Sequence, residues 1–100
     1  MIRQVVFRPD AVEDIVEAAA WYEERSPGLA TELIDEILLA ADRAAANPEL
    51  FRIIRAEGKI RHVLAERFPY RVFFSVVGEV LYVHAVLHGA QHGRRWRERL

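Results

Sequence analysis

Apolar residues recur in this chain with two different periods, one typical of helices and one typical of strands. Residues 2–7, IRQVVF, are rich in β-branched and aromatic residues and predict a short first strand. Pro9 suits the first turn of a helix, and Asp10 with Glu13 has the spacing of a capping box. The predicted core stripe of this first helix consists of Val12, Ile15, Val16, Ala19 and Tyr22.

A second helix is predicted for residues 27–46, directly after the break at Ser26-Pro27-Gly28. Proline disfavours the helical region for the residue before it, so we expect Ser26 to cap the helix that Pro27 begins. The two helices must then form an antiparallel hairpin, because the link between them is short. The expected apolar stripe is Ala30, Leu33, Ile34, Ile37, Leu38, Ala41, Ala44 and Ala45.

The second half of the chain has the alternation of strands, predicted at residues 60–67, 70–77 and 80–88. Alternation places Arg71 on the face opposite Tyr70, and it places Leu81, Val83, Ala85 and Leu87 together on one face of the last strand. The predicted fold class is α+β in the order β-αα-βββ. An antiparallel helical hairpin packs on a mostly antiparallel sheet of about four strands, within a single domain at residues 1–100.

Composition and charge narrow the class of protein. The chain has 100 residues and no cysteine, with neither a signal peptide nor a membrane-spanning run, so we expect a cytoplasmic protein that has no contact with membranes. Its net charge of −1 hides a segregation. Residues 1–50 carry four arginines against eleven acidic residues, whereas residues 51–100 carry ten basic residues against four acidic ones. The resulting charges of −7 and +6 favour a basic face for an anionic partner.

Three strings in a fixed order give the chain a resemblance to a known family. WYEERSPGLA (21–30), RFPYRVFF (67–74) and AVLHGAQHGRRW (85–96) resemble the corresponding segments of the RelE/ParE toxin superfamily, the toxin half of bacterial toxin–antitoxin pairs. The resemblance runs nearly from end to end. It implies a cognate antitoxin whose tail wraps over the helices and across the sheet, in a toxin–antitoxin hetero-oligomer. The antitoxin contacts that we assign on this basis are Trp21, Tyr22, Leu29 and Leu33.

The adjacent pair Trp21-Tyr22 also carries a physical expectation. Neighbouring residues of one helix cannot both face the same core, so one of these two rings should be exposed. For target binding we expect a basic, partly concave patch on the open face of the sheet. Its expected residues are Arg61, Arg71, Arg94, Arg95 and Trp96.

The target itself has two candidate classes within the superfamily. Ribonuclease members cut messenger RNA on the ribosome with a set of proton carriers and cations, for which this chain offers Arg61, Arg71, His88 and Arg94. The strand before the PYR-like string lacks the lysine pair of those enzymes, and no tyrosine follows Tyr82. The sequence therefore favours a ParE-like, non-catalytic inhibitor of DNA gyrase that needs no cofactor and no metal. A module that binds its antitoxin but has lost toxicity is a third possibility.

Overall fold

The computed structural model describes residues 1–89 and 94–100, with side chains for all of these except residues 94–96. The main elements are β1 (Gln4–Phe7), α1 (Pro9–Arg25), α2 (Leu29–Ala46), β2 (Ile53–Arg55), β3 (Ile60–Leu64), β4 (Tyr70–Val77), β5 (Val80–His88) and α3 (Arg94–Arg99). Two short 3₁₀ turns, Pro48–Leu50 and Glu57–Lys59, flank β2. Within the described ranges, no helix is long and apolar enough to cross a membrane.

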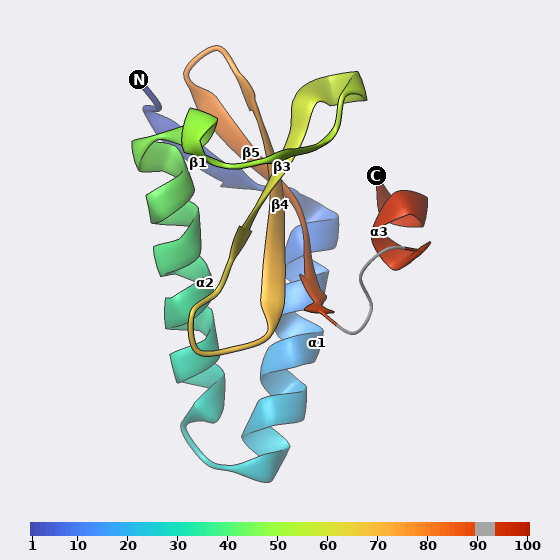
Figure 1. The fold of residues 1–100 in the computed structure, drawn as a ribbon. Helices are drawn as coiled ribbons and strands as arrows, with labels where there is room; N and C mark the ends of the chain where they lie inside the picture. Colours follow the sequence, from blue (N-terminus) through green and yellow to red (C-terminus); the bar gives the residue numbers. More distant parts are fainter. Residues whose placement is uncertain (90–93) are drawn as a thin grey trace.

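The sheet has the strand order β1-β5-β4-β3-β2, in which β1 runs parallel to β5 and the other pairs are antiparallel. Figure 1 shows α1 and α2 side by side along the sheet and α3 set apart from them beyond the strands. The predicted α+β fold is confirmed. The strand count is five instead of four, because β2 is a three-residue edge strand that is too short for alternation to detect.

Two apolar clusters lie on the two faces of the sheet. The larger cluster joins the helices to the sheet and includes Leu33, Ile37, Val72, Phe74 and Val83. The face that α1 and α2 leave uncovered is called the open face below. Its smaller cluster consists of Ile60, Phe73, Ala85 and Leu87, and Ile54 and Leu100 pack against it. The C-terminal residue after α3 therefore contacts the open face.

The strand β5 breaks the alternation that the sequence predicts. Phe73 pairs with Ala85 while Phe74 pairs with Val83, so His84 is an extra residue that bulges from β5. Leu81 and Val83 face the helices, but Ala85 and Leu87 belong to the open-face cluster. The prediction that all four share one face is therefore wrong after Val83. The bulge switches every later side chain of β5 to the other face.

The helices are also rotated relative to the predicted stripes. Val12 and Val16 are 46% and 62% exposed, whereas Ala11 and Ala18 are buried in the core. Small residues at the contact let the backbone of α1 approach β5 closely, and larger side chains then remain on the solvent side. On α2 the same rotation leaves Ile34 and Leu38 exposed. The predicted placement of these four residues in the core is therefore wrong.

The turn between the helices uses a cap that the sequence analysis missed. The carboxylate of Glu23 accepts hydrogen bonds from the backbone N–H groups of Gly28, at 3.0 and 3.1 Å, and of Ala30, at 3.1 Å. These bonds lower the pKa of Glu23, because they favour its ionised form. Gly28 precedes α2 in the left-handed region with φ of 90°. Ser26 is therefore not the cap, and α2 begins two residues later than predicted. At the other helix, α1 already begins at Pro9, so Asp10 lies inside its first turn.

Candidate functional site

The pair Trp21-Tyr22 divides between surface and core as the sequence predicts. Trp21 is 51% exposed, and the guanidinium carbon of Arg25 lies 3.4 Å from the centre of its ring. Tyr22 turns inward, with ring centres 5.1 Å from Phe68 and 6.2 Å from Tyr70. The exposed member is thus Trp21, which lies near the hairpin turn.

Tyr70 lies in the same aromatic cluster and is held in its neutral form. Burial raises the pKa of Tyr70 to about 12, and the charge and the hydrogen bond of the neighbouring Tyr22 act in the same direction. Its ring also contacts His88 edge-on, with the ring centres 5.3 Å apart. The Tyr70 hydroxyl therefore keeps its proton near neutral pH and is a poor general base.

The two leucines assigned to the antitoxin site lie deeper than a contact surface requires. Leu33 is fully buried, and Leu29 packs partly buried against the same core. The side chain of Leu33 is therefore not available to a partner.

The surface of the hairpin instead presents several apolar side chains, of which Leu39 also lies exposed on α2. We call four of them the hairpin patch: Val12, Val16, Ile34 and Leu38. Asp14 of α1 points to β5, so Val12 and Val16, on the opposite flank of that helix, project toward α2. Arg43 of α2 contacts β3, so Ile34 and Leu38 project toward α1. The patch therefore runs along the outer side of the helix pair.

The open face carries a cation beside a histidine. Arg71 lies there as predicted, because its register partner Leu87 belongs to the open-face cluster. Its Nη1 is 3.4 Å from Nδ1 of His62, whose register partner Phe73 lies on the same face. The Nε of Arg71 is buried and has no hydrogen-bond partner among the described residues. The contact of His62 with Arg71 could not be predicted from the sequence, since it depends on the register of β3 against β4.

Arg61 and His88 lie on the helix side of the sheet. Arg61 pairs with Phe74, a member of the larger cluster, and its side chain donates a hydrogen bond of 2.7 Å to the carbonyl of Phe51. It also lines a cleft of about 890 Å³ at the end of α2. His88 pairs with Tyr70, whose ring packs on the helix-side core. The expectation that Arg61 and Arg71 share one basic patch is therefore wrong.

The remaining predicted target residues belong to α3. Arg94, Arg95 and Trp96 form its first half, and their side chains lie outside the described part of the structure.

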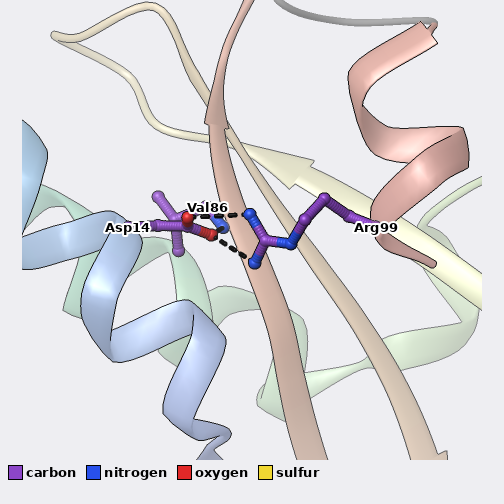
Figure 2. A network of polar contacts seen from close by, with 3 residues as sticks. All are labelled: Asp14, Val86 and Arg99. Atoms are coloured by element: carbon purple, nitrogen blue, oxygen red, sulfur yellow. Dashed lines mark hydrogen bonds and ion pairs between the residues drawn. The ribbon is translucent and has the colours of Figure 1, made fainter.

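The position of α3 itself is fixed by another arginine of the same helix, Arg99. The guanidinium of Arg99 forks onto both carboxylate oxygens of Asp14, at 2.8 and 2.9 Å. Figure 2 shows the Asp14 carboxylate, which reaches out from α1, in contact with this guanidinium from α3 and beside the backbone of Val86.

The same Asp14 carboxylate accepts a hydrogen bond of 2.9 Å from the N–H of Val86. This donor lies on the part of β5 that extends beyond its partner β1, so Asp14 satisfies an edge group that the sheet leaves unpaired. The bond from Asp14, together with the charges of Asp10 and Glu13, raises the pKa of Arg99. This role of Asp14 was not predicted from the sequence. The missed signal is its position between Ala11 and Ala18, the residues with which it shares a helix face.

Next to this contact, His84 occupies the bulge of β5. Its Nε2 lies 2.7 Å from the hydroxyl oxygen of Ser75. Burial, and then the charge of Arg8, lowers the pKa of His84, so the ring is neutral at physiological pH. Within the described ranges, no group of three or more acidic or histidine side chains could hold a metal ion.

Comparison with known proteins places this fold in a family. The family described as "ParE toxin of type II toxin-antitoxin system, parDE" matches residues 5–93. The chain therefore belongs to the ParE toxin family of type II toxin–antitoxin systems. This confirms the resemblance that the three sequence strings indicated.

A solved structure agrees in fold. The structure titled "Chromosomal ParDE TA system from P. aeruginosa" superposes with a TM-score of 0.75 at 18% sequence identity. The match covers 88% of this chain and 96% of that chain. At this identity the likeness shows the shared fold alone. A search of curated proteins found no match.

Proposed function

We propose that this ParE toxin acts in the cytoplasm by inhibiting DNA gyrase, without cutting RNA, and that a cognate antitoxin neutralises it. The observation that carries this proposal is the distribution of the candidate catalytic groups over both faces of the sheet. Arg71 is on the open face, whereas Arg61 and His88 are on the helix side.

Phosphodiester transfer needs a proton acceptor, a proton donor and a stabilising cation within hydrogen-bond reach of one phosphate, at about 3 Å. Side chains on opposite faces of a sheet cannot meet this condition together. Arginine does not replace the missing base, because it stays protonated at neutral pH. The geometry thus supports a toxin that works by binding.

One observation favours the ribosome-dependent messenger RNA endoribonuclease as the second candidate. His62 and Arg71 lie together on the open face, where they would supply one proton carrier and one cation. A nuclease of this chain would therefore use His62 in the place that the sequence analysis gave to His88. Among the described residues the pair lacks a second available proton carrier, since the next histidine of the open face, His84, is part-buried and hydrogen-bonded to Ser75.

For the antitoxin, we place the contact on the outer side of the helical hairpin. An exposed apolar strip is suited to an amphipathic segment that inserts apolar side chains. The hairpin patch supplies such a strip. Trp21, 51% exposed on the flank of α1 that carries Asp14, supplies a separate anchor for a segment that wraps around the helices. Large aromatic residues of this kind often contribute most of the binding energy of an interface.

The test of this proposal is induced expression, followed by the order in which DNA and protein synthesis fail. A gyrase inhibitor should stop incorporation of labelled thymidine first, while incorporation of labelled amino acids continues at the start. Co-expression of the antitoxin should prevent both effects. Early loss of protein synthesis, abolished by His62→Gln, would favour the nuclease. If neither synthesis is affected, the chain is an antitoxin-binding module without toxicity.

A further inference from the structure

The cleft of about 890 Å³ lies where the helical layer ends, at the C-terminus of α2. Its floor is the helix side of the sheet, since Val76 pairs with Leu81, a member of the larger cluster. Its walls come from the end of α2 and from the first two residues of the chain, which Figure 1 shows at the same end of the molecule. The apolar residues that line it are Met1, Ile2, Ala45, Ala46, Pro48 and Val76. The volume lies in the range of about 300–1,000 Å³ that is usual for binding pockets.

Four charged side chains also line this cleft: Asp42, Glu49, Lys59 and Arg61. Among the described residues, no ion pair joins any of these four to one another or to a further charged group. Arg61 is half-buried, and its printed partner is neutral, the carbonyl of Phe51 at 2.7 Å. A half-buried guanidinium is stabilised by a carboxylate, because charge-assisted hydrogen bonds are the stronger ones. The cleft therefore offers a cation that lacks an anionic partner.

Lys59 reaches the cleft from the turn that joins β2 to β3. Gly58 and Lys59 both lie in the left-handed region, with φ of 76° and 49°. Within the described ranges, Lys59 is the one residue other than glycine with a positive φ. Such a conformation is uncommon for a residue with a side chain, and it occurs preferentially at binding sites. The turn thus places a second cation in the cleft beside Arg61.

The cleft continues the hairpin patch along α2. Leu38 and Ala45 are seven residues apart, close to two turns of a helix, so they lie on the same flank of α2. The cleft therefore begins about 10 Å beyond Leu38 along the helix axis. A segment that binds along the hairpin patch can extend into the cleft without crossing the sheet.

We propose that this cleft is a second docking site for the antitoxin, in which one antitoxin carboxylate binds Arg61 and Lys59 while a neighbouring apolar side chain covers Val76. This inference rests on the proposed function, in which a cognate antitoxin neutralises the toxin. The planar fork of a guanidinium matches the two oxygens of a carboxylate. A nucleic acid fits the cleft less well, because its row of phosphates would also meet Asp42 and Glu49.

The experiment is a calorimetric titration of the full chain with its purified antitoxin. Arg61→Gln should weaken binding about tenfold, because the charge-assisted fork is lost. Lys59→Gln should weaken it about threefold, since this side chain is exposed. The matched control is Arg52→Gln, which removes the same charge from an exposed position outside the cleft and should change the affinity less than about twofold. Lys59→Gln also carries the test if Arg61→Gln does not fold.

A double-mutant cycle identifies the carboxylate. Each Asp or Glu of the antitoxin is replaced in turn by its amide. One such replacement should weaken binding to the unchanged protein and have little further effect on binding to Arg61→Gln. Equal affinities of Arg61→Gln, Lys59→Gln and Arg52→Gln for the antitoxin would overturn the proposal. Binding of a DNA duplex that is lost in Arg61→Gln, while the antitoxin affinity is unaltered, would overturn it as well.

Leu38→Ala separates the cleft from the antitoxin contact on the hairpin. If Leu38→Ala weakens antitoxin binding while the cleft variants do not, the cleft proposal fails and the hairpin contact stands. The reverse result removes the hairpin patch from the interface and retains the cleft. Gyrase is absent from this titration, so failure of the cleft proposal leaves the proposed inhibition of gyrase standing.

Discussion

Two leucines of the same helix give a direct test of which surface the antitoxin uses. Leu33 is fully buried, while Leu38 is 45% exposed in the hairpin patch. Replacing Leu33 by Ala removes buried methyl groups and leaves a cavity, which costs about 2–5 kcal/mol of the free energy of unfolding. For a domain of this size the loss corresponds to a fall in Tm of roughly 10–30 °C. Leu38→Ala should cost less than about 1 kcal/mol, because much of that side chain is already in water.

The binding assay should give the opposite order. Below the Tm of both variants, Leu38→Ala should weaken antitoxin binding by about 1–2 kcal/mol, because Leu38 belongs to the proposed contact surface. Leu33→Ala should leave the affinity of the folded fraction unchanged. Thermal unfolding followed by circular dichroism and titration calorimetry with the antitoxin measure the two quantities. The reasoning fails if Leu33→Ala weakens binding while Leu38→Ala has no effect on it.

Three further outcomes follow from individual side chains. Trp21→Ala should weaken antitoxin binding by about 1–3 kcal/mol, and unchanged affinity in calorimetry would remove Trp21 from the site. The pKa of Glu23 is lowered in the folded protein, so the hydrogen bonds that its ionised carboxylate accepts from Gly28 and Ala30 stabilise the fold above the ordinary carboxyl pKa. This stabilisation is lost as the pH falls through the lowered pKa. Thermal unfolding between neutral and acidic pH should therefore show a smaller fall in Tm for Glu23→Gln than for the unchanged protein, and parallel curves would refute the cap. For His84, whose pKa is also lowered, the folded state takes up its proton later than the unfolded state, so stability should fall as pH drops below the ordinary histidine value. An NMR titration should give a midpoint for His84 below 6.5, whereas a midpoint at or above that value would contradict its burial against Ser75.

Periodicity predicts the elements of this protein well because each long element buries one face. The helical hairpin and the strands β4 and β5 were predicted within about two residues of their ends, which is the usual uncertainty of such boundaries. Alternation also placed Arg71 correctly on the open face. Alternation could not predict an extra residue inside a strand. The bulge at His84 follows from the pairing of two strands, and it moves Ala85 and Leu87 to the other face.

The rotation of the helices was missed for a related reason. Hydrophobicity favours Val12 and Val16 for the core, but the close approach of α1 to β5 favours Ala11 and Ala18. The close approach of two elements depends on tertiary packing, and its only signal in the sequence is a row of small residues at helical spacing. The candidate site shows the same limit, because the contact of Arg99 with Asp14 joins residues 85 positions apart in the chain.

The most direct test of the central claim is the supercoiling of relaxed plasmid by purified gyrase in the presence of this protein. We expect that the protein inhibits supercoiling and that the cognate antitoxin restores it. We also expect that His88→Ala leaves the inhibition unchanged, because His88 lies on the helix side with Tyr70. Undiminished supercoiling, together with messenger RNA cut on programmed ribosomes, would contradict the account and establish the nuclease in its place.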